Sequence, residues 1–352
     1  MTSHITLDRY VYEDIYPSFK AATDEKEITA RINRTFLNYL AQRNLLLTGD
    51  SPAVVADIGC GPCDTLVKYL TGVIFPPGFI LRATDYIPEY ADARRGEALG
   101  ILAAAQASNV IKVADFSVRA GNAFGGNLIA LLTGNQEEAK MRNAFRVVFA
   151  SHVMYHAEGA SEVQRLVADV ASNLLTRDGV CILYHIANTR GSFQEFRGQF
   201  GSQAGAARDS DTGAVTIDDP PAQIGAACSA TGLPLYQTEF ATKLHFGSLR
   251  DAEWRAFKDP LTYDALADSN PAAYEDLKRL YFVIQRAPLE FAADHSATGL
   301  GTFIDQIRVV IEANHGVLPS TERMQVFSRA DAPAAFGEVI PEALAASIRS
   351  DT

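Results

Sequence analysis

The stretch VVADIGCGPCDTLVKYL, residues 54–70, decides the fold of this chain, and it supports two interpretations that exclude each other. Its centre, CGPC at 60–63, has the spacing of a redox dithiol at the start of a helix. Its first half, DIGCG at 57–61, has the pattern of a glycine-rich turn that joins a strand to a helix and binds a nucleotide. The rest of the chain must therefore show which chemistry the stretch serves.

Short apolar runs alternate with helical patterns on both sides of this stretch. Strands are predicted at 54–58, 79–85, 110–115, 146–151, 180–187, 233–246 and 322–330. Strands that are apolar throughout and alternate with helices are typical of a parallel sheet covered on both faces. The sequence therefore predicts an α/β fold of the Rossmann-like, doubly wound kind, with a mostly parallel seven-stranded sheet.

Helical patterns also flank this core. At the N-terminus, Ile28, Ile32, Phe36 and Leu40 recur every four residues and predict a helix. Three more helical patterns follow residue 250, in DAEWRAFK, PAAYEDLKRLYFVI and TFIDQIRVVIEANHG. We therefore divide the chain into an N-terminal aromatic and helical lid (1–48), a nucleotide-binding core (49–246), a helical cap insertion (247–315), and a last strand with a C-terminal helix (316–352).

Composition excludes several classes of partner. The chain has 352 residues, 47% of them hydrophobic, and a formal net charge of −11 without a basic block. This charge argues against non-specific binding to nucleic acid or to anionic membranes. The sequence shows neither a signal peptide nor an apolar run of the ~20 residues that span a bilayer. With only four cysteines, a cytoplasmic protein that acts on a small molecule is expected, and its oligomeric state is left open.

The companions of the glycine turn favour a nucleoside. Gly59 and Gly61 stand where a chain must bend sharply and approach a ligand closely. Asp85 ends the second predicted strand, where a carboxylate can accept hydrogen bonds from ribose hydroxyls. Asp115 ends the third predicted strand and is followed by Phe116, a pair suited to the amine and the face of adenine. Acids at the ends of successive strands predict a nucleoside cleft.

The dithiol interpretation explains less of the sequence. Cys60 and Cys63 could form a thiolate pair at the start of a helix. In thioredoxins this motif usually follows a tryptophan, whereas the only tryptophan here is Trp254. Thiol exchange also leaves the acids of the strand ends without a role. A dithiol oxidoreductase is therefore kept as the weaker alternative.

At this point the sequence resembles the class I S-adenosylmethionine (SAM) dependent methyltransferases. DIGCGPCDT, LRATDYIPEY, KVADFS and FRVVFASHVMYHAEG are similar to their first, second, adenine and fourth motifs, over about residues 53–187. The order of parts is most similar to the branch that includes histamine N-methyltransferases, in which an N-terminal segment folds over the site. The resemblance implies SAM as cofactor. It implies that the cofactor is bound by Asp57, Gly59, Cys60, Gly61, Asp85, Tyr86, Asp115, Phe116 and Ser151.

Polar residues just beyond the fourth predicted strand are the candidate catalytic residues. His152 or His156 is expected to orient or deprotonate the acceptor, and Tyr155 to point at the sulfonium region of SAM. The alternative is that these side chains only cap a helix or pack in a loop.

Aromatic residues of the N-terminal segment are candidates for a lid. Tyr12, Tyr16 and Phe19 could close over the cofactor and exclude water, or could pack a helix onto the core. No spacing of histidines, cysteines and acids suggests a metal site.

The function that follows is a SAM-dependent transferase that moves the methyl group to nitrogen or oxygen of a small molecule by in-line displacement. One alternative uses the same cofactor differently: a cyclase or alkyl-transfer enzyme would release methylthioadenosine from the aminobutyl chain. A dinucleotide oxidoreductase ranks below methyl transfer, and a SAM-binding regulator without catalysis is also compatible. The sequence does not identify the acceptor, the atom that is methylated or the pathway.

Overall fold

The computed structural model describes residues 16–46, 49–74, 77–85, 91–135, 137–154, 157, 159–187, 220–247, 260–284 and 298–349. They form two compact units, which are described separately. The larger unit contains the described parts of Lys26–His185, Thr216–Phe240 and Glu322–Thr352. The smaller unit contains those of Met1–Glu25, Ile186–Val215 and Ala241–Thr321.

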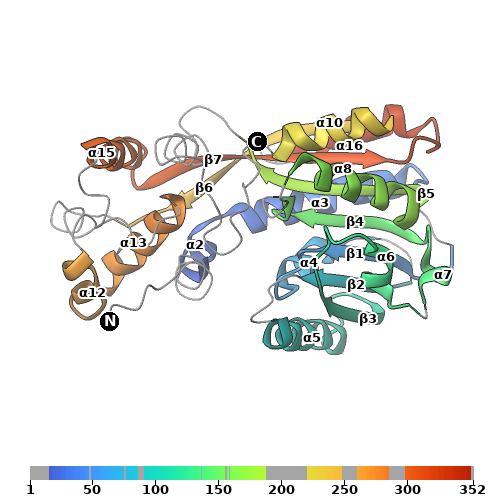
Figure 1. The fold of residues 1–352 in the computed structure, drawn as a ribbon, viewed down its shortest axis with the longest axis horizontal. Coiled ribbons are helices and arrows are strands. Elements are labelled where there is room, and N and C mark those ends of the chain that lie inside the picture. The colour runs from blue at the N-terminus through green and yellow to red at the C-terminus, as the bar shows by residue number, and fades with distance from the viewer. Residues whose placement is uncertain are drawn as a thin grey trace. The chain divides into compact units, whose positions relative to one another are not determined.

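The larger unit is built on one sheet with the strand order β3-β2-β1-β4-β5-β7-β6 (Figure 1). Neighbouring strands from β3 to β5 are parallel. The strand order reverses beside β1, as it does in doubly wound folds, so the predicted fold class is confirmed. The strands are β1 (Ala53–Ile58), β2 (Phe79–Asp85), β3 (Val113–Ala120), β4 (Phe145–Ser151), β5 (Leu175–Ile186), β6 (Leu235–His245) and β7 (Val317–Ser328).

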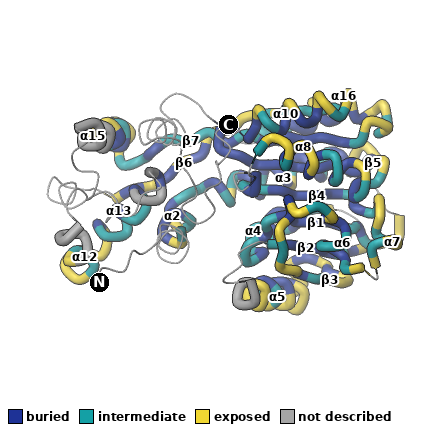
Figure 2. Tube along the Cα trace, viewed as in Figure 1, coloured by how far each residue is buried: buried dark blue, intermediate teal, exposed yellow. Residues whose placement is uncertain are grey.

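Helices cover both faces of this sheet because its central strands are apolar on both sides. In β1, Val55 packs into one hydrophobic cluster, and Ala56 and Ile58 pack into the other. Figure 2 shows the central strands as buried. The first cluster includes residues of α3 (Glu25–Gln42), α4 (Asp64–Leu70), α5 (Ala91–Ala107) and α16 (Phe336–Arg349). The second includes residues of α6 (Leu128–Thr133), α8 (Ala160–Asp169) and α10 (Pro220–Thr231). Two short helices lie in the connections between these elements: α7 (Glu138–Met141) precedes β4, and the π-helical η3 (Val170–Leu174) joins α8 to β5.

The third strand lies later in the sequence than predicted. The prediction placed it at 110–115, whereas β3 spans Val113–Ala120. The apolar run that marked it ends at Asp115, but the strand continues because β3 is the edge strand and one of its faces is exposed. Continuous hydrophobicity marks only strands that are buried on both faces, so an edge strand escapes this criterion.

The smaller unit brings together helices from both flanks of the sequence. It contains α2 (Tyr16–Ala22), α12 (Pro260–Ser269), α13 (Pro271–Ile284) and α15 (Thr298–Ala313). Helix α2 packs on α13: the Ser18 hydroxyl donates to the Glu275 carbonyl at 3.0 Å, and Arg279 Nε donates to the Ser18 carbonyl at 3.3 Å. The predicted domain boundaries stay predictions. Among the described helices, none has both the length and the apolar composition needed to cross a membrane.

Candidate cofactor site and active site

The glycine turn after β1 has the backbone shape that the sequence predicts. Gly59 and Gly61 have φ values of 73° and 50°, and Cys63 follows with 63° before α4 begins. The N–H groups of Gly59 and Cys60 both donate to the carbonyl of Thr84, at 2.8 and 3.0 Å. A Cβ atom on Gly59 would lie 2.8 Å from Val153 Cγ2. Glycine is therefore required at 59 by both the backbone angle and the available space.

Two carboxyl groups lie at the carboxyl edge of the sheet beside this turn. Asp57 is the penultimate residue of β1 and is 5% exposed, and Asp85 is the last residue of β2. Burial raises the pKa of Asp57 to about 8, with a further contribution from the negative charge of Asp85, while Lys26 acts in the opposite direction. A cationic ligand beside this pair would favour the charged carboxylate. The residues present thus fit a ligand that combines a nucleoside with positive charge.

Asp115 and Phe116 do not lie at that edge, so their predicted position is wrong. Asp115 is opposite Ile80 near the start of β3, whereas Ala120 is the residue opposite Asp85. Ala120 is five positions beyond Asp115, which corresponds to roughly 17 Å along a strand. The Asp115 carboxylate instead accepts a hydrogen bond from Arg82 at 2.6 Å. This ion pair compensates a guanidinium that is almost completely buried.

Asn122 occupies the position in which Asp115 was expected. The N–H of Gly121 donates to the Asp85 carbonyl at 3.0 Å, so the chain after β3 lies beside the end of β2. The Asn122 side chain accepts a hydrogen bond from the N–H of Phe124 at 2.8 Å, which fixes the turn that follows the strand. Sequence analysis missed Asn122. The Gly-Asn pair after an alternating polar strand is the signal that identifies this turn.

Ser151 ends β4 and is tied to the helix that follows the glycine turn. Its hydroxyl lies 3.1 Å from the hydroxyl of Tyr69 in α4. The Tyr69 ring packs against Phe149 and Tyr184, with centroid distances of 5.2 and 5.6 Å. These buried contacts fix β4 relative to α4. The expected contact of Ser151 with the cofactor stays a prediction.

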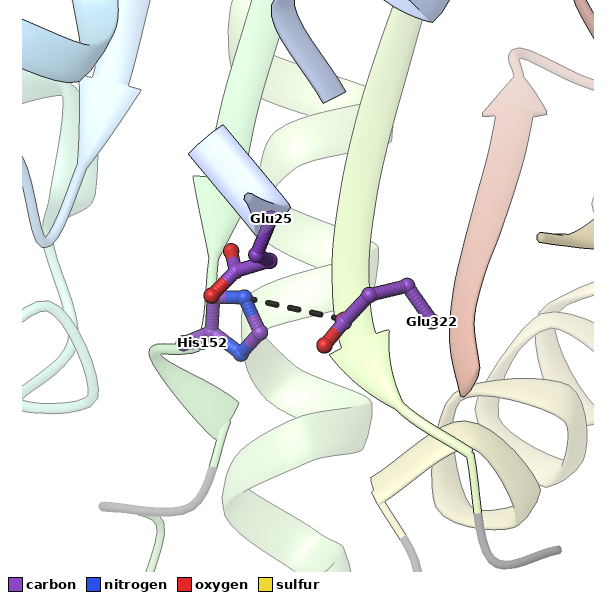
Figure 3. A group of neighbouring side chains, drawn as sticks. All are labelled: Glu25, His152 and Glu322. Carbon is purple, nitrogen blue, oxygen red and sulfur yellow. Dashed lines mark ion pairs between the residues drawn. The ribbon is translucent and has the colours of Figure 1, made fainter. Parts of the chain in front are cut away.

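His152 follows Ser151 and has an uncommon backbone conformation. Its φ is 56°, in the left-handed region, which costs a residue other than glycine about 1 kcal/mol. Its N–H donates to the Tyr184 carbonyl at 2.9 Å. Figure 3 shows its imidazole facing the carboxylate of Glu322 in β7, with Nε2 3.7 Å from Oε2. Sequence analysis missed Glu322, because no local pattern links β7 to the end of β4.

The two cysteines of CGPC lack the properties of a redox pair. Cys60 is 5% exposed and Cys63 is completely buried. A hydrogen bond with Cys63, together with burial, raises the pKa of the Cys60 thiol well above its usual range. Thiol exchange requires a thiolate that its partner can reach, so this geometry argues against dithiol chemistry.

The remaining candidate residues are described only in part. Tyr12, Tyr86, Tyr155 and His156 lie outside the described residues. Tyr16 and Phe19 belong to α2, and their rings stack with centroids 6.3 Å apart. Phe19 is 9% exposed, so it packs within the smaller unit. The closing of these aromatics over a cofactor stays a prediction.

Comparison with known proteins gives matches only among solved structures. No protein-family model and no curated protein matches the chain. The chain is similar to the YcgJ protein from Bacillus subtilis, with 14% identity and a TM-score of 0.40 over 83% of this chain and 98% of that one. It is also similar to the cyclopropane synthase MmaA2 from Mycobacterium tuberculosis, with 13% identity and a TM-score of 0.38 over 82% of each chain. A third similar structure is phosphoethanolamine N-methyltransferase 2 from Haemonchus contortus with SAM, with 10% identity and a TM-score of 0.38 over 83% of this chain and 52% of that one.

Proposed function

We propose that this protein is a SAM-dependent methyltransferase that transfers the methyl group to nitrogen or oxygen of a small molecule. The observation that carries the proposal is the carboxyl edge of the central strands. There the glycine turn lies beside two carboxyl groups, the buried Asp57 and the half-buried Asp85. SAM joins a nucleoside to a sulfonium and an ammonium, so it matches an edge that provides both a nucleotide turn and two neighbouring carboxyl groups.

Each residue of this edge has a proposed role. Gly59 and Gly61 are proposed to pass the methionine part of SAM, and the open space around the Cβ position of Gly61 supports this role. Asp57 balances positive charge, and Asp85 accepts hydrogen bonds from the ribose hydroxyls. Asn122 replaces Asp115 as the residue proposed to meet the adenine. When bound, SAM supplies a methyl group that is already electrophilic.

The chain's own contribution to the reaction is then alignment and proton transfer. His152, at the end of β4, is proposed to accept the proton that the acceptor gives up when its nitrogen or oxygen is methylated. Its backbone is fixed by the hydrogen bond from its N–H to the Tyr184 carbonyl, which holds the residue at the end of β4.

The expected partner is a small molecule, and neither nucleic acid nor a membrane. The net charge of −11 supports this, because it opposes binding to polyanionic surfaces. All four cysteines are buried and free, which fits a reducing compartment. We therefore propose a role in small-molecule biosynthesis in the cytoplasm.

Titration calorimetry with SAM, followed by mass spectrometry of the products, tests this proposal. The protein is incubated with SAM alone and with pooled acceptors, and a sample without protein serves as the control. S-adenosylhomocysteine that forms only with an acceptor establishes methyl transfer. Methylthioadenosine that forms from SAM alone establishes the aminobutyl alternative. Absence of SAM binding contradicts both.

A further inference from the structure

The imidazole of His152, at the end of β4, lies beside a buried carboxylate, that of Glu322. Glu322 is only 2% exposed at its side chain, whereas the His152 side chain is 21% exposed. The position of Glu322 along the sheet follows from the pairing of the strands. The N–H of Ala187, directly after β5, donates to the carbonyl of Thr321 at 2.7 Å, so Glu322 lies level with the end of β5. A carboxylate is thus buried beside the imidazole at the edge where the cofactor turn lies.

Burial of a carboxylate is unfavourable unless nearby groups compensate its charge. An imidazole that becomes positively charged when it accepts a proton supplies such compensation. The negative charge of a carboxylate beside one ring nitrogen also favours the proton of neutral imidazole on that nitrogen. Since Oε2 of Glu322 lies 3.7 Å from Nε2, we expect neutral His152 to carry its proton on Nε2 and a lone pair on Nδ1.

We propose that Glu322 is a positioning residue that holds His152 as a base acting through Nδ1. This inference rests on the proposed function. In the proton-transfer step, the N–H or O–H bond of the acceptor breaks, and its electron pair stays on the acceptor atom. A new N–H bond forms at Nδ1, and the resulting imidazolium faces the Glu322 carboxylate. The substrate class is therefore a nucleophile that enters the site protonated, as a hydroxyl or an ammonium group.

The first test reads the tautomer directly and needs neither cofactor nor turnover. Long-range ¹H–¹⁵N correlation spectra of the full chain, recorded at about pH 8.5, distinguish Nε2–H from Nδ1–H in neutral histidine. The chain has seven histidines, so the spectrum of His152→Gln identifies the His152 signals by their absence. Nε2–H is expected in the wild type. In Glu322→Gln, where the amide can donate to Nε2, a shift toward Nδ1–H is expected.

Glu239→Gln is the matched control for loss of a negative charge. Glu239 lies on β6, where it bonds to Arg323 and is 41% exposed at its side chain. This variant removes a carboxylate that contacts Arg323, the residue directly after Glu322. Unlike Glu322, this carboxylate is exposed. The His152 tautomer and the turnover number are expected to stay at wild-type values.

Kinetics give the second test. We expect Glu322→Gln to lower kcat by roughly 10- to 100-fold and His152→Gln by roughly 10²- to 10⁴-fold. The SAM dissociation constant should stay within about twofold, because neither residue belongs to the cofactor turn. The double variant should be no slower than His152→Gln alone, since the carboxylate acts through the imidazole.

The outcomes separate this inference from the proposed function. A wild-type protein that does not bind SAM contradicts the proposed function, while the tautomer still decides the pairing of Glu322 with His152. Nδ1–H in the wild type, or unchanged tautomer and kcat in Glu322→Gln, overturns the inference even if SAM is bound and turned over. Circular dichroism checks folding. If Glu322→Gln does not fold, the wild-type tautomer and the kinetics of His152→Gln decide.

Discussion

Asp57 is a carboxyl group that folding moves next to another carboxyl group and away from water. Its raised pKa means that the folded chain binds this proton more tightly than the unfolded chain does. As pH rises from about 4 toward 8, the unfolded state releases the proton while the folded state retains it. The free energy of unfolding therefore falls over this window, and the contribution of Asp57 is constant above it.

Asp57→Asn removes this dependence. We expect the variant to gain stability relative to the wild type as pH rises, by roughly 3 kcal/mol between pH 5 and pH 8, because each pKa unit corresponds to about 1.4 kcal/mol. Urea unfolding at several pH values measures the difference. SAM affinity should fall by about tenfold or more in the same variant. A stability difference that does not change with pH would mean that Asp57 is charged in the folded protein at pH 5.

Gly59 and Gly61 form a natural pair for comparison. Gly59→Ala should cost about 2–3 kcal/mol of unfolding free energy, since it adds contact with Val153 to an unfavourable backbone angle. Gly61→Ala should cost about 1 kcal/mol, because nothing lies within 4 Å of its Cβ position. Chemical denaturation measures both. Adding Val153→Ala to Gly59→Ala should recover the part of the unfolding free energy that is lost through contact with Val153. Equal costs for Gly59→Ala and Gly61→Ala would contradict the argument.

At the scale of single elements, the strand ends decide how far the sequence alone could predict the site. β1 and β2 are buried on both faces, so their apolar runs end where the strands end, and Asp85 was placed correctly. β3 alternates polar and apolar residues because one face is exposed, so the same criterion stopped it early and selected Asp115. Glu322 could not be predicted, since its pairing with His152 depends on tertiary structure and not on local periodicity.

The reassignment of the adenine contact can be tested with two variants. Asn122→Ala should weaken SAM binding by roughly tenfold, the effect of losing one good hydrogen bond to the ligand. Asp115→Asn should leave the SAM dissociation constant within about twofold, because Asp115 is near the other end of β3, paired with Arg82. Titration calorimetry measures both constants. Weaker binding only in Asp115→Asn would restore the original assignment.

For the whole molecule, the strand order follows from a few sequence signals that agree. Apolar runs, the helices between them and one glycine turn predict a doubly wound sheet, because few topologies satisfy all three. Which helices pack together in the smaller unit could not be predicted from such sequence signals. α2 and α13 are far apart in the sequence, and the amphipathic pattern of α13 is compatible with many partners.

A ligand that binds the folded larger unit must stabilise it as a whole. At 100 times its dissociation constant, SAM should raise the free energy of unfolding by about 2.7 kcal/mol. Thermal unfolding monitored by circular dichroism should show a midpoint that rises with SAM concentration, and Asp85→Asn should require more SAM for the same rise. NAD serves as the control ligand. A rise with NAD but not with SAM would support the dinucleotide alternative.

The exposed face of β3 has one more consequence, for how copies of this protein behave toward one another. An edge strand offers unpaired backbone groups on which a second chain can add. Asp115 and Arg119 carry opposite charges along this edge and are exposed, so an added strand would have to desolvate them. The polar residues that made the predicted third strand end too early are thus the ones that oppose aggregation. If both were valine, the strand would be obvious from sequence and the protein would be prone to self-association.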